Sequence, residues 1–169
     1  ELNNIQSYDK ATIGSSALLA ALKRNLRAEL AVWLKQHFVA ILNDFEKYFD
    51  TLDLCVLMEE GVLTDFPLAP LAFSLQQHMA PRVLQANGCT SKPTKVNKSI
   101  LAGCKLSVPF TRVYAPRRFI KLVEDHKKAN PELFVDDTSL HATAETYQEV
   151  EDILVNAMKQ FQTLVNELN

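Results

Sequence analysis

The last two dozen residues constrain the fold more than any other part of the chain. Thr146 and Glu149 form a capping box, in which a threonine and a glutamate three residues later satisfy free amide groups at a helix start. After it, apolar residues keep helical spacing to the end of the chain, namely Val150, Ile153, Leu154, Ala157, Met158, Phe161, Leu164, Val165 and Leu168. This pattern predicts a long helix whose apolar face must be covered by a sheet or by other helices.

Further helices are predicted upstream. Over residues 15–36 a leucine recurs every fourth position, and Ser15 or Ser16 can cap the first turn. Helices are also expected over residues 52–61, 68–86 and 106–128. Asn87 and Gly88 are expected to close the second of these, and Pro116 should interrupt the third. The leucines of the first helix, which would line one face, are Leu18, Leu22, Leu26 and Leu30.

Strands are few. The run from Phe38 to Leu42 is continuously apolar, which is typical of a strand buried on both faces, and Asp44 follows it closely. A second strand is predicted over residues 133–135, ending in the acids Asp136 and Asp137, with residues 138–142 returning as its hairpin partner. Because long helices separate these strands, we expect an α+β fold, a small sheet with helices packed on it.

The acids that end both strands allow two interpretations. Adjacent carboxylates such as Asp136 and Asp137 raise the cost of ionising one another, and a hard divalent cation with oxygen ligands relieves that repulsion. Asp44 would supply a further carboxylate if its strand pairs with the second one. The alternative is a plain hairpin turn, since Asp-Asp is also a common turn dipeptide.

Composition limits the class of protein. Apolar residues make up 47% of the chain and charged residues 22%, as in a globular domain. The net charge of −2 does not indicate nucleic-acid binding by overall electrostatics, so any basic groove must be local. Cys55, Cys89 and Cys104 form no CxxC pair and are odd in number, which argues against a zinc site or a disulfide framework.

The same features bear on location. A chain without a disulfide framework suits a reducing intracellular compartment, the nucleus or the cytoplasm. No apolar run reaches the 18–20 residues that cross a bilayer, and we see no signal peptide or other targeting signal. We therefore expect an intracellular protein with no membrane partner.

Three short motifs resemble those of one enzyme family. The segment "DFEKYFDTL" (44–52) resembles motif A of reverse transcriptases, which reads D-x-x-K-A-F-D-T-V in retroelement enzymes. "FVDD" (134–137) is similar to motif C, an aromatic residue, any residue and two aspartates. "AGCKLSVPF" (102–110) is similar to motif B, commonly Q-G-x-x-L-S-P, with Ala102 in place of the glutamine. The three occur in the family's order, A, B and C.

The resemblance implies a fold and a division of the chain. It implies a polymerase palm-like small antiparallel sheet with packed helices, together with part of the fingers and no thumb. Residues 1–37 would form the end of a fingers-like helical region. Residues 38–169 would form the palm-like catalytic region as one compact unit, a fragment of a larger enzyme.

The resemblance also implies an activity. The chain would be the catalytic region of an RNA-directed DNA polymerase, a nucleotidyltransferase that adds deoxynucleotides to a primer 3′-hydroxyl on an RNA template. Its cofactor would be Mg²⁺ (or Mn²⁺) in a two-metal site. By the same resemblance Asp44, Asp136 and the backbone carbonyl of Phe45 would bind the metal, and Asp137 would support them.

Other motif residues would bind the substrates. Phe49 matches the aromatic residue that lies beneath the incoming sugar, where a ring collides with a 2′-hydroxyl and so favours deoxynucleoside triphosphates. Gly103, Lys105 and Ser107 of motif B would bind the nucleotide, because glycine permits close backbone approach. A local basic groove for the DNA primer and RNA template would use cations that neutralise phosphates, among them Arg112, Arg117 and Arg118.

Two alternatives remain open at this stage. One is a catalytically degenerate palm that folds and binds but does not polymerise, which the loss of the motif B glutamine at Ala102 would suit. The other is an α-rich protein-interaction module whose last helix offers its apolar face to a partner. Pairing of the strand that ends at Asp44 with the hairpin that carries Asp136 would favour a palm over the interaction module. Nothing in the sequence decides the oligomeric state.

Overall fold

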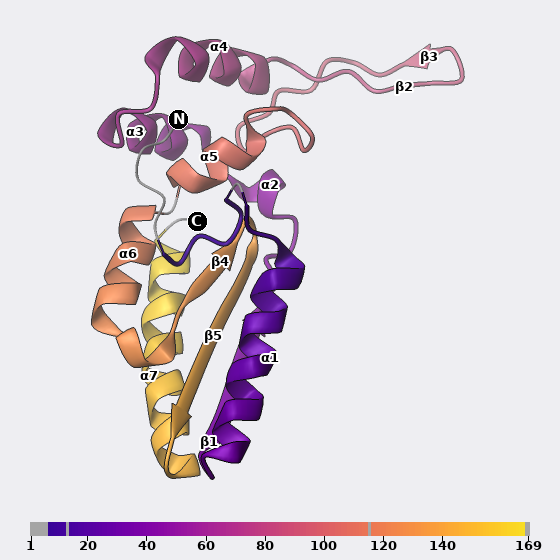
Figure 1. Ribbon diagram of the computed structural model, residues 1–169. Coiled ribbons are helices and arrows are strands. Elements are labelled where there is room, and N and C mark those ends of the chain that lie inside the picture. Colours follow the sequence, from indigo (N-terminus) through magenta and orange to yellow (C-terminus); the bar gives the residue numbers. More distant parts are fainter. Residues whose placement is uncertain (1–6, 13, 115, 168–169) are drawn as a thin grey trace. The chain divides into compact units, whose positions relative to one another are not determined.

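The chain divides into two compact units (Figure 1). The computed structural model describes residues 7–12, 14–114 and 116–167, apart from the side chains of residues 116–118. Within the described residues, unit 1 comprises the parts of Glu1–Glu46 and Pro116–Glu167, and unit 2 comprises the part of Lys47–Ala115. The predicted subdomain boundary between residues 37 and 38 falls inside unit 1.

Unit 1 is built on a three-stranded antiparallel sheet. Its strands are β1 (His37–Asn43), β4 (Glu132–Phe134) and β5 (Asp137–Ala144), in the order β1-β5-β4. The pairing of β1 with β5 runs from His37 opposite Ala144 to Asn43 opposite Thr138. The predicted α+β class is therefore confirmed, and so is the predicted pairing of the strand before Asp44 with the hairpin that carries Asp136.

One expectation about this sheet is wrong. The strand around Phe38 to Leu42 was expected to be buried on both faces, but β1 lies at the sheet edge and Leu42 is 67% exposed. The reason is that β1 pairs with β5 alone, while β5 takes the central position. Accordingly β5 is the strand whose side chains are buried almost without interruption, from Thr138 to Ala142.

The two faces of β5 meet different helices. Successive side chains of a strand point to opposite faces, and Leu140, Ala142 and Ala144 contribute to the apolar core that α7 (Tyr147–Asn166) completes. His141 points to the other face, where its ring contacts Arg27 of α1 (Ala17–Trp33). Figure 1 shows α7 and α1 running along the sheet. Helix α6 (Pro116–Asp125) adds Phe119 and Leu122 to the same core as α7.

Helix α7 has the predicted start and the predicted buried face. The Thr146 hydroxyl oxygen accepts a hydrogen bond from the Glu149 amide at 3.3 Å. Glu151 and Lys159 are exposed as expected, whereas Ile153 is half-buried. The buried side chains of the helix are Val150, Leu154, Ala157, Phe161 and Leu164.

Helix α1 also begins as predicted. The Ser16 hydroxyl oxygen accepts a hydrogen bond from the Leu19 amide at 3.1 Å, which identifies Ser16 as the N-cap. The helix ends at Trp33, three residues earlier than expected. Its fully buried residue is Ala31, and its repeated leucines are exposed.

Unit 2 is mainly helical. Its helices are α2 (Tyr48–Thr51), α3 (Leu54–Leu63), α4 (Leu68–Met79) and α5 (Ser107–Tyr114). They surround a second apolar core that contains Leu52, Leu57, Leu71, Phe110 and Val113.

Two expectations about these segments need correction. The helix predicted over residues 68–86 ends at Met79, because Pro81 cannot continue a helix and holds Ala80 in an extended conformation. Asn87 and Gly88 have φ angles of 51° and 77° and form a tight turn between β2 (Gln85–Ala86) and β3 (Cys89–Thr90) instead of closing a helix. Asn-Gly is the preferred sequence for a two-residue hairpin turn with positive φ at both positions.

The helix predicted over residues 106–128 is divided into α5 and α6, followed by the 3₁₀ helix η1 (Lys127–Ala129). Pro116 begins α6, a position where its missing amide costs little.

The core of unit 1 predicts a stability difference within a single helix. Leu154 on α7 is 2% exposed, so Leu154→Ala should lower the free energy of unfolding by about 3 kcal/mol, because it leaves a cavity. Val155 on the same helix is 42% exposed, and Val155→Ala should change that free energy by less than about 0.5 kcal/mol. Urea denaturation followed by circular dichroism measures both. Equal losses in the two variants would contradict the placement of this core.

Candidate functional site

The two strands of the motif C segment join through a very short turn. Phe134 at the end of β4 pairs with Asp137 at the start of β5, so Val135 and Asp136 form the turn between them. Val135 has a φ of 60°, which is rare for a β-branched residue and costs conformational energy. The structure therefore places Asp136 at the tip of the hairpin and Asp137 at the first position of the central strand.

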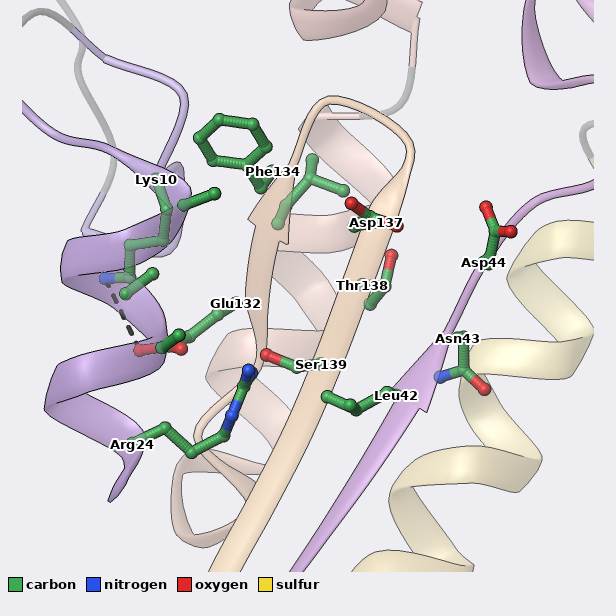
Figure 2. Close-up of a pocket in the computed structure, with 14 residues that line it drawn as sticks. Lys10, Arg24, Leu42, Asn43, Asp44, Glu132, Phe134, Asp137, Thr138 and Ser139 are labelled. Carbon is green, nitrogen blue, oxygen red and sulfur yellow. Dashed lines mark ion pairs between the residues drawn. The ribbon is translucent and has the colours of Figure 1, made fainter. Parts of the chain in front are cut away.

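Asp44 lies at the same end of the sheet. Asn43 is the last residue of β1 and pairs with Thr138 of β5. Opposed residues in antiparallel strands have Cα atoms about 5 Å apart. One residue further along each strand, Asp44 and Asp137 therefore lie next to one another, as Figure 2 shows.

Electrostatics links the three predicted acids. Burial raises the pKa of the Asp137 carboxyl group above its ordinary value, and the nearby carboxylates of Asp136 and Asp44 raise it further. Like charges disfavour ionisation of a carboxyl group, and a bound cation would reverse the effect. The end of the sheet is thus an acidic site formed by two strands and one turn.

A pocket of about 280 Å³ lies between α1 and this end of the sheet (Figure 2). Asp44 and Asp137 line it from the strands, and Lys10 and Arg24 line it from the N-terminal segment and α1. Asp136 is not among its lining residues. The pocket thus has Asp44 and Asp137 at the end of the sheet and cations on the opposite side, where Lys10 is already paired with the Glu132 carboxylate at 3.7 Å. The remaining lining residues are Ala17, Ala20, Ala21, Leu42, Asn43, Glu132, Leu133, Phe134, Thr138 and Ser139.

The buried hydroxyl group of Thr138 lacks a partner. Thr138 is 2% exposed, and its side-chain oxygen forms no hydrogen bond in the described part of the structure. Thr138 is opposite Asn43, whose side-chain amide donates to the Met158 sulfur of α7. The hydroxyl therefore lies on the α7 face of the sheet and not on the face that α1 lines.

The acids fit a magnesium ion that is bound together with a substrate. Among the described residues, no group of three or more His, Cys, Asp or Glu side chains is arranged to hold a metal ion. Mg²⁺ does not need such a group, because proteins often bind it through one or two carboxylates together with water and substrate phosphates. Asp44 and Asp137 supply two carboxylates, and Asp136 adds its charge beside them.

The aromatic residues of motif A have structural contacts. Phe45 packs against the core of unit 1, with its ring 5.9 Å from that of Phe161 on α7. Phe49 belongs to unit 2, where it packs against the second core and its ring lies 5.8 Å from that of Tyr48. Phe45 thus adjoins Asp44 within unit 1, and the predicted sugar-contacting residue Phe49 lies in the other unit.

The motif B residues also lie in unit 2. Gly103 has a φ of 85° in the turn before α5, and no atom lies within 4 Å of where a Cβ would be, so the turn rather than a close contact requires glycine. The Ser107 hydroxyl donates to the Leu101 carbonyl at 2.6 Å and closes this turn. Lys105 is exposed, and Arg112 is half-buried on α5. Arg117 and Arg118 lie in α6, and their side chains lie outside the described residues.

Sequence patterns did not reveal the ionic cluster beside the pocket. The Arg27 guanidinium donates to Nε2 of His141 at 2.6 Å and lies 3.3 Å from the Glu132 carboxylate, which Lys10 also approaches at 3.7 Å. Arg27 lies more than a hundred positions from both Glu132 and His141 in the sequence, so no local spacing could have predicted the cluster. It connects α1 to the polar face of the sheet.

His141 is neutral in this cluster. The ring is 1% exposed, and burial lowers its pKa to about 4, with the neighbouring Arg27 and Arg24 acting in the same direction and Glu132 opposing them. Arginine is always a donor, so Nε2 must be the accepting nitrogen and Nδ1 carries the proton. Nδ1 is buried and has no hydrogen-bond partner in the described structure.

A second missed cluster lies in unit 2. The Ser99 hydroxyl donates to the Asp50 carboxylate at 3.1 Å and accepts from Arg82 at 3.2 Å. Ser99 has a φ of 117°, an unusual conformation for a residue other than glycine. This cluster ties the second aspartate of motif A to the segment before motif B.

No family model matches the chain, and no curated protein matches it. In the described part of the chain, no helix combines the length and apolarity required to cross a membrane.

The neutral state of His141 predicts a pH-dependent stability. The unfolded chain binds a proton at this histidine near pH 6.5, whereas the folded protein does so only near pH 4. Stability should therefore fall as the pH drops from about 6.5 to about 4, by on the order of 3 kcal/mol for this group. Urea denaturation at several pH values measures it. His141→Gln should flatten the profile, and His126→Gln should leave it unchanged. A wild-type slope that persists in His141→Gln would contradict this assignment.

The acidic end of the sheet predicts coupled titration. Asp44→Asn should lower the pKa of Asp137, because it removes one of the neighbouring negative charges. Addition of Mg²⁺ to the wild-type protein should lower it as well. Carboxyl carbon chemical shifts followed by NMR during a pH titration report this pKa. Glu151→Gln on the exposed side of α7 is the matched control and should have no effect. The same Asp137 titration curve in all samples would mean that the acids do not share a site.

Proposed function

We propose that this chain is the palm-like catalytic region of a reverse transcriptase of retroelement type, an RNA-directed DNA polymerase. The observation that carries the proposal is the antiparallel pairing of β1 with β5, which sets Asp44 beside Asp137, the residue that follows the turn residue Asp136. The motif resemblance adds to it, because these three acids belong to the segments that are similar to motifs A and C.

The acids would bind the catalytic metal. Asp44, Asp136 and Asp137, with the backbone carbonyl of Phe45, would hold Mg²⁺ (or Mn²⁺), which would activate the primer 3′-hydroxyl and neutralise charge on the phosphates. Arg24 on the α1 side of the pocket would favour the phosphate groups of a deoxynucleoside triphosphate by charge, whereas Lys10 is already paired with Glu132. Such a contact would orient the substrate.

The remaining residues would act on the nucleotide and the nucleic acid. Phe49 would exclude ribonucleotides, and Gly103, Lys105 and Ser107 would contact the incoming nucleotide. An RNA template and a DNA primer would be bound through phosphate contacts by Arg112, Arg117 and Arg118. RNA templates and deoxynucleoside triphosphates are both found in the nucleus and in the cytoplasm. The proposed activity would therefore take place in one of these two compartments.

A palm-like domain that binds without catalysis is the second candidate. Its support is that the described residues contain no group of three metal-binding side chains, and that α1 covers the sheet face beside the acids. The pocket left between them, about 280 Å³, is slightly below the usual size of small-molecule sites, about 300–1,000 Å³.

Primer extension separates the two candidates. On an RNA template with a DNA primer, deoxynucleotides and Mg²⁺ or Mn²⁺, Asp44→Asn and Asp136→Asn should each reduce extension by at least about 100-fold, because loss of a metal ligand removes charge stabilisation worth several kcal/mol. Asp152→Asn, on the exposed side of α7, should extend primers like the wild type. A wild-type protein that is folded but extends no primer with either metal would favour the non-catalytic candidate.

A further inference from the structure

The outward side of α1 is strongly apolar. Five large apolar residues on this side, which we call the leucine face, are each between 51% and 80% exposed. Four of them are leucines at intervals of four residues, and a tryptophan follows one turn later. The leucine face consists of Leu18, Leu22, Leu26, Leu30 and Trp33.

The inward side of α1 is made of smaller residues. Ala31 is buried, and Ala17, Ala20, Ala21 and Arg24 line the pocket against the sheet. A surface helix normally turns its larger apolar side chains towards the core. In α1 the alanines face the sheet and the leucines face outward, so the helix has a second apolar surface that unit 1 does not cover.

The size of this surface matches that of a protein interface. From the exposed fractions of its side chains, the leucine face presents on the order of 700 Å², which exceeds the roughly 300–600 Å² of the largest apolar patch on a typical monomer. It is close to the about 800 Å² that each partner contributes to a standard interface. A second copy of the same face would therefore bury enough area for a stable dimer.

Charges on either side of the leucine face are complementary. Lys23 and Glu29 are both exposed, and they lie three residues before and three residues after Leu26. At 3.6 residues per turn, these positions are about 60° to either side of Leu26. If two α1 helices lie parallel about a two-fold axis, the side that carries Lys23 meets the side that carries Glu29 of the other copy. An antiparallel pair would bring like sides together.

We propose that the leucine face of α1 is a homodimer interface, in which two copies of the chain pack their α1 helices in parallel about a two-fold axis beside Leu26. A two-fold interface uses the same patch on both copies and must be self-complementary, which the leucines at the centre and the opposite charges at the sides provide. The inference is independent of the catalytic activity proposed above.

Analytical ultracentrifugation tests the dimer. The wild-type protein should sediment with twice the 19.0 kDa mass of the chain at micromolar concentration, and Leu26→Glu should raise the dimer dissociation constant by at least about 100-fold, because it buries two like charges at the axis. Leu84→Glu is the matched control, a leucine that is 78% exposed in the hairpin of unit 2, and should leave the dissociation constant unchanged. A wild-type protein that is monomeric at 200 μM, or a dimer that Leu26→Glu does not weaken, would overturn the proposal.

A charge exchange tests the parallel arrangement. Lys23→Glu and Glu29→Lys should each weaken the dimer by roughly 3- to 10-fold, since each places like charges together, and the double variant should restore the wild-type dissociation constant. Circular dichroism confirms that each variant is folded. A double variant that dimerises no better than the single ones would overturn the parallel arrangement.

Discussion

The antiparallel pairing of β1 with β5 is the constraint on which the rest of unit 1 depends. It joins segments about a hundred residues apart in the sequence, and its register decides which side chains share a face. A shift of one residue would move every side chain of β1 to the other face. In the observed register the apolar residues Val39 and Ile41 lie opposite Ala142 and Leu140, under α7, and Asp44 comes next to Asp137. The apolar core and the acidic end of the sheet are thus two consequences of one pairing.

The opposite face of the sheet is held by polar contacts rather than by an apolar core. The Arg27 guanidinium connects α1 to His141 and Glu132, and the alanines of α1 allow the helix to approach the strands closely. Buried charges are costly unless they are paired, and here Glu132 has two cationic partners while His141 stays neutral. Such a face contributes less to stability than the α7 side does. It also leaves room for the pocket between α1 and the acids.

The two sides of α1 connect the proposed catalytic site with the proposed dimer interface. The polar face carries the pocket, which α1 lines on one side and the proposed catalytic acids Asp44 and Asp137 line on the other. The leucine face of the same helix lies on its outward side and is the proposed dimer interface. Both proposals therefore depend on how α1 packs, because one side of the helix lines the pocket and the other side forms the proposed interface.

The sequence by itself determined the elements whose signals are local. The N-caps at Thr146 and Ser16 and the helix break at Pro116 are all present in the structure, because each depends on residues within one or two turns. The positions of the acids just after β1 and in the β4–β5 hairpin were also predictable, since each follows a short apolar run. The Asn87-Gly88 signal is local too, but it was assigned to a helix end instead of a hairpin turn, because both structures use residues with positive φ.

Only the tertiary structure decided which strand is central, which face of α1 is buried and which residues surround the acids. β5 rather than β1 lies in the middle of the sheet because it pairs on both sides, and strand composition does not encode the number of neighbours. The leucines of α1 are exposed because alanine and arginine face the sheet, which reverses what their apolarity alone suggests. The cluster of Arg27, His141 and Glu132 joins segments that are distant in the sequence. The distances between its side chains are set by the packing of α1 on the sheet, which no local pattern of residues predicts.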